Sequence, residues 1–306
     1  MKHTTMKNIF ILALTSVFSL YGCKEPVQVE PNIEVSGKDE VQYSEFKVVS
    51  YNILEGMKND KAANYDNFVE WVKKQNPDVL ALQECNGFTE SSLKELAQRW
   101  GHTDARIMRY PNRYYPVAIT SKHPIEVVKY MPENAEDNSL WHNAIHAKIK
   151  GFNFVVLHLY PFGRYPNTSS SAEGSGEEYR ISEMTYILDS TMRKYLNEPD
   201  WLMMGDFNSV SPYDKEHLGN DWYYDLHSFV LENGYYDAVR ERHNHFINST
   251  SANRLDFIYT SKSLLKNIIE ADIIKDEFTT SQVQVSEGQT EQISDHYPVT
   301  VTFRYK

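Results

Sequence analysis

Cysteine and positive charge are both scarce in this chain, and each shortage excludes a class of protein. Its 306 residues include two cysteines, Cys23 and Cys85. If Cys23 is a lipidation site, as its surroundings indicate below, Cys85 has no partner within the chain and a disulfide framework is excluded. The net charge of −11 argues against a protein that binds nucleic acid through a broad basic face. It does not exclude a nuclease, because a bound divalent cation supplies positive charge locally.

Signature motifs of several common enzymes are also missing. There is no G-x-S-x-G elbow of a serine hydrolase, no Walker loop and no dinucleotide-binding fingerprint. No internal repeat is obvious, although strand–helix alternation in each half indicates two similar halves. What is present is a hydrophobic content of 41% with 13% aromatics, which is enough for a real core. The length allows one large domain or two small ones.

The N-terminus has the composition of a targeting segment. Lys2 and Lys7 precede an apolar stretch, residues 9–20, that is too short to span a bilayer comfortably. The stretch ends in Leu-Tyr-Gly-Cys, which resembles a bacterial lipobox and predicts that Cys23 is lipidated and begins the mature protein. The alternative is an ordinary secretory signal with a chance cysteine.

The boundaries that follow are a signal peptide over 1–23, a tether over 24–44 and a folded domain over 45–306. The tether is polar and charged and contains Pro26 and Pro31. This organisation predicts a bacterial cell-envelope protein, anchored by lipid to the outer or inner membrane, with no transmembrane helix in the mature chain. We also expect a monomer.

Apolar strands alternate with amphipathic helices, a pattern typical of an α/β fold. Residues 46–54 predict a first buried strand, 65–75 a helix and 79–82 a second buried strand. Such a unit pairs its strands in parallel, so Asn52 and Glu84 should lie at the same edge of the sheet. Further strands are expected at 105–110, 117–121, 125–130, 141–150, 152–159, 201–204, 255–259, 268–274 and 299–303, helices at 89–100, 177–196 and within 221–239, and a polar surface loop at 166–178.

The stretch Met204-Gly205-Asp206-Phe207-Asn208 organises the candidate site. A buried apolar run ends in a glycine, and two polar side chains follow, separated by one residue. Other predicted strands also carry polar residues near their ends, and the full set is Asn52, Glu84, His158, Asp206, Asn208, Asp256, Asp295 and His296. Carboxylates gathered in one crevice repel one another unless a cation lies among them. Oxygen-rich ligation favours Mg²⁺ over Zn²⁺ or Cu²⁺. With two histidines added, the set meets the needs of phosphate-ester hydrolysis.

The sequence resembles the endonuclease/exonuclease/phosphatase superfamily of metal-dependent phosphoesterases. The matching blocks follow the family order over residues 46–305 and are Ser50-Tyr51-Asn52, Leu82-Gln83-Glu84, Val156-Leu157-His158, Gly205-Asp206-Phe207-Asn208, Arg254-Leu255-Asp256-Phe257-Ile258 and Ser294-Asp295-His296-Tyr297-Pro298. The resemblance implies a four-layer α/β sandwich, with two central mixed β-sheets packed face to face and helices outside. One departure is Pro116, which stands where relatives often have glycine.

The resemblance also implies a role for each polar residue. Glu84 would be the principal metal ligand, with Asn52 and Asp295 close by, and the ion would be Mg²⁺ or alternatively Mn²⁺. Asp206 would orient or deprotonate the attacking water, and Asn208 would hold a phosphate oxygen. His296 would contact the phosphate with its ring fixed by Asp256, and His158 would support the leaving oxygen or the phosphate.

The predicted function is therefore metal-dependent hydrolysis of phosphate esters by a phosphodiesterase acting outside the cytoplasm. Extracellular nucleic acid, phospholipid head groups and sugar phosphates stay open as substrates, and the residue set does not separate monoesters from diesters. The acidic charge disfavours duplex DNA, whose binding rewards many Lys and Arg contacts. The alternative is a non-catalytic surface binding module on the same fold. Such a module should have lost several of the polar strand-end residues, because without catalysis they only cost stability.

Overall fold

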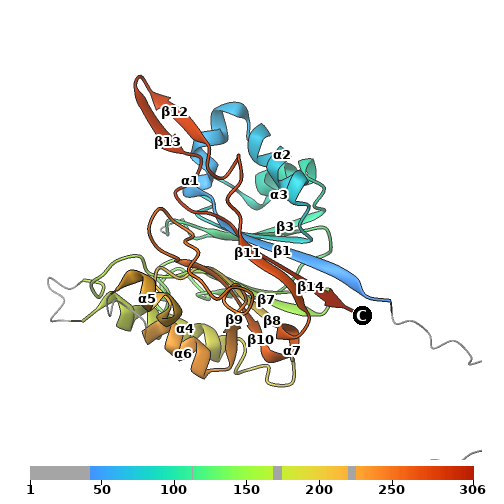
Figure 1. Ribbon diagram of the computed structural model, residues 1–306, viewed down its shortest axis with the longest axis vertical. Coiled ribbons are helices and arrows are strands. Elements are labelled where there is room, and N and C mark those ends of the chain that lie inside the picture. Colours follow the sequence, from blue (N-terminus) through green and yellow to red (C-terminus); the bar gives the residue numbers. More distant parts are fainter. Residues whose placement is uncertain (1–41, 112, 168–173, 220–224) are drawn as a thin grey trace, which may run out of the picture. The chain divides into compact units, whose positions relative to one another are not determined.

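Two six-stranded mixed β-sheets pack face to face, with helices on both outer faces (Figure 1). The structure is a computed structural model that describes residues 42–306, except 112, 168–173 and 220–224. The predicted signal peptide, Cys23 and nearly all of the predicted tether lie outside these residues. Within them the layers run helices, sheet, sheet, helices, which confirms the predicted α/β sandwich.

Both sheets have the same internal pattern. The first runs in the order β11-β14-β1-β2-β4-β3 and the second in the order β5-β6-β7-β8-β10-β9. In each sheet one parallel pair, β1–β2 or β7–β8, lies at the centre with antiparallel neighbours on either side. The strands are β1 (Ser44–Asn52), β2 (Val79–Gln83), β3 (Asp104–Met108), β4 (Val117–Ser121), β11 (Ile268–Ile273) and β14 (Val299–Tyr305) in the first sheet, and β5 (Glu126–Met131), β6 (Ala144–Ile149), β7 (Phe152–His158), β8 (Trp201–Asp206), β9 (Tyr235–Asp237) and β10 (Asp256–Ser261) in the second.

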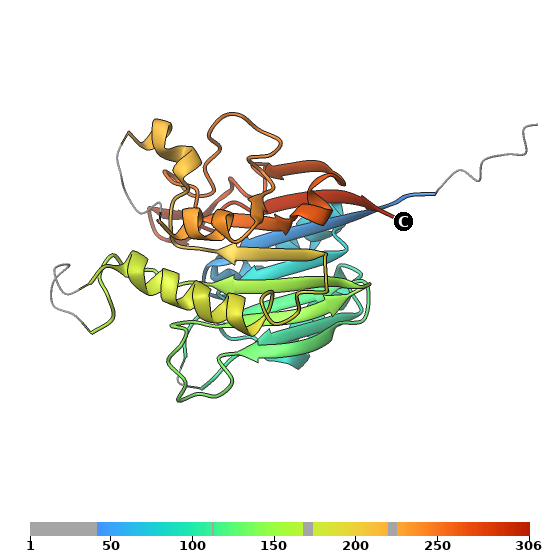
Figure 2. The same ribbon diagram turned by 90° about the horizontal axis from the view of Figure 1, so that it is seen from below.

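The main helices divide between the two outer faces. α2 (Asp66–Gln75) and α3 (Glu90–Arg99) pack on the first sheet, and α4 (Gly176–Ser190) and α6 (Asp225–Glu232) pack on the second (Figures 1 and 2). Thr89 and Ser175 open α3 and α4 with capping boxes. Shorter helices are α1 (Leu54–Met57), η1 (Lys58–Ala63), η3 (Pro212–Asp214), α5 (Lys215–Leu218) and α7 (Lys262–Leu265).

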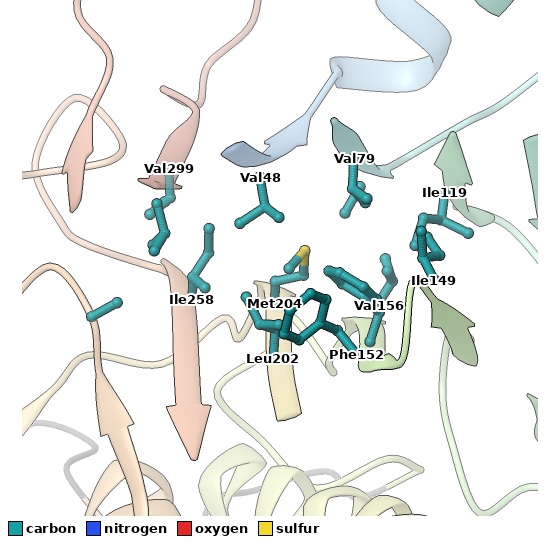
Figure 3. Close-up of a cluster of buried hydrophobic side chains, with 14 of the residues drawn as sticks. Val48, Val79, Ile119, Ile149, Phe152, Val156, Leu202, Met204, Ile258 and Val299 are labelled. Atoms are coloured by element: carbon teal, nitrogen blue, oxygen red, sulfur yellow. The ribbon is translucent and has the colours of Figure 1, made fainter. Parts of the chain in front are cut away.

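The period of two along each strand explains how three hydrophobic layers form. Val48 of β1 points between the sheets with Val156 and Met204, as Figure 3 shows. Its neighbour Val49 points to the opposite face and packs under α2 and α3. The same alternation in the second sheet sends Met203 under α4. A strand buried on both faces therefore reads as a continuous apolar run.

Some predicted boundaries are wrong. The helix expected at 177–196 ends at Ser190, where the Thr191 hydroxyl donates to the Ile187 carbonyl and competes with the backbone bond that would continue the helix. The loop expected at 166–178 is shorter, because α4 already begins at Gly176. The strand expected at 141–150 starts at Ala144. The hairpin of β12 (Gln282–Ser286) and β13 (Gln289–Gln292) was not predicted, since its residues are mostly polar.

None of the helices in the described part of the chain is both long and apolar enough to cross a bilayer. Cys85, two residues after the end of β2, is a buried free thiol.

Candidate active site

One amide side chain links the two sheets at the predicted site. Asn52, at the end of β1, donates from Nδ2 to Glu84 Oε1 at 3.2 Å and to Asp206 Oδ2 at 3.1 Å. Glu84 follows the neighbouring strand β2, which pairs in parallel with β1 as predicted. Asp206 comes from the end of β8 in the other sheet. Asn52 therefore joins carboxylates from both sheets at one point.

Strand register places a row of polar residues along the same edge of the second sheet. His158 pairs with Asp206, and Asp206 pairs with Asp256. Paired residues project on the same face, so the three side chains lie next to one another. His158 Nε2 is 3.5 Å from Asp206 Oδ2. Burial raises the pKa of Asp206 to about 7, although the nearby His296 opposes the shift.

Asp256 and His296 form a buried pair. His296 Nδ1 lies 2.7 Å from Asp256 Oδ2, and its Nε2 lies 3.8 Å from Asp206 Oδ2. The hydroxyl of Ser249 also donates to Asp256 Oδ2 at 2.7 Å. Burial alone would lower the pKa of His296, but the charges of Asp256 and Asp206 outweigh it and raise the pKa to about 10. The ring is therefore held as a cation between two carboxylates.

His158 and Asn208 complete the second sheet's contribution. Burial, together with the nearby rings of His142 and His296, holds the pKa of His158 well below its usual value, so its imidazole is neutral at neutral pH. The backbone of Asn208 has a φ of +50°, a left-handed conformation that asparagine tolerates. Its backbone N–H donates to Asp206 Oδ1 at 2.8 Å and its Nδ2 donates to the Leu159 carbonyl at 3.0 Å. The turn after β8 is thereby fixed at both ends.

The Glu84 carboxylate is positioned by an unusual backbone. Glu84 itself has φ +59°, a conformation that costs a non-glycine residue about 1–2 kcal/mol. Its Oε2 accepts the backbone N–H of Glu55 at 3.0 Å. Gly56, which follows Glu55, must be glycine, because a Cβ there would lie 2.1 Å from the Asn86 carbonyl oxygen. The segment that contains Glu55 and Gly56 therefore packs closely against the segment after β2 and orients the Glu84 carboxylate. Backbone strain of this kind is common at functional sites.

Comparison with known proteins supports the same interpretation. A family model described as the Endonuclease/Exonuclease/phosphatase family matches residues 49–296. The chain belongs to this family. No protein with a curated description matches the sequence.

Several solved structures of other proteins have the same fold as this chain. An AP endonuclease from Archaeoglobus fulgidus is 18% identical with a TM-score of 0.61, over 84% of this chain and 99% of that one. An endonuclease/exonuclease/phosphatase family protein from Bacteroides thetaiotaomicron is 17% identical with a TM-score of 0.60, over 87% and 99%. A 3'-5' exonuclease from Neisseria meningitidis is 18% identical with a TM-score of 0.61, over 85% and 100%. At this level of identity the likeness shows the fold alone.

Metal ligation in this family member fits the residues predicted for it. Each oxygen of Glu84 accepts one hydrogen bond, which leaves lone pairs for a cation. Burial raises the pKa of Glu84, and the negative charge of nearby Asp295 adds to the shift, so two carboxylates lie close enough to repel. Asp295 is exposed, whereas Asn52 is fully buried. Oxygen donors of this kind suit a hard divalent cation, and the positive charge of nearby His296 offsets only part of the effect of burial on Glu84.

A second group of possible ligands was not predicted as a metal site. Ligand atoms of Asp206, Asp256 and His296 all lie within 4.8 Å of one another. The family resemblance implied catalytic roles for these residues instead. Asp256 Oδ1 has no hydrogen-bond partner within the described residues, although the atom is buried.

Sequence reasoning missed three residues beside the site. Ser249, which fixes Asp256, lies in an irregular segment with no periodic signal. His142 stacks on His158 with ring centroids 4.3 Å apart. Asn143 extends the polar row, because its carbonyl accepts the backbone N–H of His158 at 3.3 Å. The Asn143 amide is buried and has no hydrogen-bond partner among the described residues.

Proposed function

We propose that the protein is a Mg²⁺-dependent phosphodiesterase, with Mn²⁺ as the alternative ion. The observation that carries the proposal is the Asn52 amide, which hydrogen-bonds to both Glu84 and Asp206. It brings the predicted metal ligand and the predicted water-orienting carboxylate together from two different sheets.

Glu84, Asn52 and Asp295 would hold the cation, which when bound supplies positive charge to the phosphoryl oxygens. Asp206 would orient the attacking water and accept its proton. The carboxylate is fixed for this task by the Asn52 amide and the Asn208 backbone N–H. Each of these hydrogen bonds limits its rotation before substrate arrives, which is the preorganisation that catalysis needs.

The remaining residues would act on the phosphate. His296, held as a cation by Asp256, would neutralise a non-bridging oxygen of the substrate. The neutral ring of His158 would support the leaving oxygen or the phosphate. The Asn208 amide, oriented by its bond to the Leu159 carbonyl, would donate to a phosphate oxygen.

We also propose that the protein acts at the bacterial cell envelope, anchored through a lipid on Cys23. The support is the Leu-Tyr-Gly-Cys sequence after an apolar stretch of residues 9–20. Such a location favours substrates outside the cytoplasm, namely extracellular nucleic acid, phospholipid head groups or sugar phosphates.

The test is release of p-nitrophenol from bis-p-nitrophenyl phosphate with and without Mg²⁺. Glu84→Gln keeps the size of the side chain and removes its charge, so we expect activity to fall by about two orders of magnitude or more, with partial recovery at high Mg²⁺. Glu198→Gln is the matched control. Glu198 also accepts a hydrogen bond from an asparagine amide, that of Asn153. Asn153 and its strand partner Trp201 lie near the starts of β7 and β8, at the opposite end from the site.

Equal activity of the two variants and the wild type, with unchanged Mg²⁺ titration, would contradict the assignment of Glu84. Absence of any metal-dependent hydrolysis by the folded wild-type protein would instead favour the non-catalytic binding module.

A further inference from the structure

An aromatic cavity of about 680 Å³ opens beside the candidate active site. Its described lining is rich in rings, with Tyr114 78%, Phe162 55% and Trp141 39% exposed. Tyr165 and Tyr179 also line it. These exposed rings share one cavity, and contiguous exposed apolar surface marks binding sites, whereas a singly exposed ring does not. The volume lies in the range of small-molecule pockets.

The cavity adjoins the catalytic row through two rings that also line it. His142 stacks on His158 at a centroid distance of 4.3 Å, and Tyr115 lies 6.2 Å from the same ring. The cavity wall therefore lies one ring away from His158, so a group attached to a phosphate at His158 would be adjacent to the cavity. Neither His142 nor Tyr115 belongs to the set predicted from the sequence.

Side chains of helix α4 hydrogen-bond to the backbone of the two segments that carry Trp141 and Phe162, both of which line the cavity. The buried Glu183 carboxyl group accepts the backbone N–H of Trp141 at 2.7 Å and that of Tyr160 at 2.9 Å. Arg180 Nη1 donates to the carbonyls of Tyr160 and Phe162 at 2.8 and 3.2 Å. The cavity is thus held open before a ligand arrives, which lowers the entropy lost on binding.

The charge of the lining selects among possible ligands. Arg113 lines the cavity, and none of the described lining residues is acidic. A quaternary ammonium head group also favours aromatic walls, but Arg113 would repel it. A sugar ring carries many hydroxyls, each of which must be paired when it leaves water. A nucleobase offers two flat faces for stacking and few edge groups to satisfy.

We propose that this aromatic cavity is a nucleobase subsite that binds the base of a nucleotide whose phosphate lies at His158. The inference rests on the proposed phosphodiesterase function for the position of the phosphate, and it narrows the substrate class to nucleotides or single-stranded nucleic acid. Stacking tolerates any base, so little sequence preference is expected.

The test is calorimetric binding of four monophosphates to the full protein: adenosine monophosphate, ribose phosphate, glucose phosphate and phosphocholine. All four present a phosphate, and only the first carries a base. We expect adenosine monophosphate to bind about tenfold or more tightly than the other three, since each base–aromatic stack is worth a factor of this size. Phe162→Ala and Trp141→Ala should each remove most of that advantage.

Two controls separate stacking from general damage. Trp141→Phe keeps an aromatic face and should keep most of the advantage. Tyr43→Ala removes an aromatic side chain that is 54% exposed but lies outside the cavity, and it should change nothing. Equal binding of adenosine monophosphate and ribose phosphate would overturn the proposal. Tighter binding of glucose phosphate or phosphocholine would overturn it in favour of a sugar or a choline head group.

Failure of the base subsite and failure of the proposed function give different results. If Glu84→Gln leaves hydrolysis unchanged but adenosine monophosphate keeps its Phe162-dependent advantage, the assignment of the metal site fails and the base subsite stands. If hydrolysis depends on Glu84 but no base advantage is found, the subsite fails alone.

Discussion

The pairing of Asp256 with His296 predicts that the two residues contribute to catalysis as one unit. His296 Nδ1 lies 2.7 Å from Asp256 Oδ2, and both side chains are buried. Among the groups that raise the pKa of His296, the charge of Asp256 has the largest effect. Asp256→Asn keeps the shape and removes the charge that holds His296 as a cation. We expect kcat to fall by roughly 10²–10⁴-fold, the range for lost acid–base or electrostatic assistance.

A double-mutant cycle distinguishes a unit from two independent residues. If His296 works only while Asp256 fixes it, adding His296→Ala to Asp256→Asn should lower kcat by less than about tenfold further, because residues acting together are strongly non-additive. If the two act separately, their losses should multiply, so that two losses of about 10²-fold combine to about 10⁴-fold. Multiplicative losses would refute the pairing.

The assay is kcat on a chromogenic phosphodiester at saturating Mg²⁺, with a cooperative melting transition required of every variant. Asp104→Asn is the matched control. Asp104 is also a buried carboxylate paired with a cation, Arg106, and it accepts the backbone N–H of Ile125 at 3.0 Å. It lies on β3, the edge strand of the other sheet. This control should lose stability and leave kcat unchanged.

Two further predictions concern the anchor and a buried carboxyl. Cys23→Ser should abolish incorporation of labelled fatty acid, and mass spectrometry of the wild type should find Cys23 as the mature N-terminus; a different first residue would disprove lipidation there. Burial raises the pKa of Glu183 to about 8, above its ordinary value of 4.5. The contribution of Glu183 to the unfolding free energy is therefore complete below pH 4.5 and is lost as the pH rises toward 8. The unfolding free energy of the wild type, compared with Glu183→Gln, should therefore decline between pH 5 and 8, by at most about 1.4 kcal/mol per unit, and a pH-independent difference would contradict this.

The strands of the core could be predicted because both of their faces are buried. A strand such as β8 is apolar from Trp201 to Met204 and stands out from its polar surroundings, and Asp206 at its end marks the sheet edge. The parallel pairing of β1 and β2 followed from the helix between them, and it placed Asn52 beside Glu84 as expected. The positions of the predicted residues therefore came from topology, and only their roles came from the family resemblance.

The hairpin β12–β13 could not be predicted for the opposite reason. Its residues are almost all exposed, and within the described residues its two strands pair only with each other. Val283 and Val285 alternate with polar residues in β12, but over only five residues, and β13 contains no apolar residue to match them. The aromatic cavity was missed for a different reason. Its rings come from segments around residues 113, 141, 162 and 179, and only the tertiary fold brings them together. No single segment carries a signal of its own.

Asn143 shows that the polar row extends to residues that precede a strand. For the parallel strands β7 and β8, the polar residues of the site lie at the strand ends. In a mixed sheet, however, an antiparallel neighbour begins at the edge where a parallel strand ends. Asp256 is the first residue of β10, and Asn143 comes just before β6, and both strands run antiparallel to the central pair. A search that includes the residues before antiparallel strands would have added Asn143 to the row formed by His158, Asp206 and Asp256.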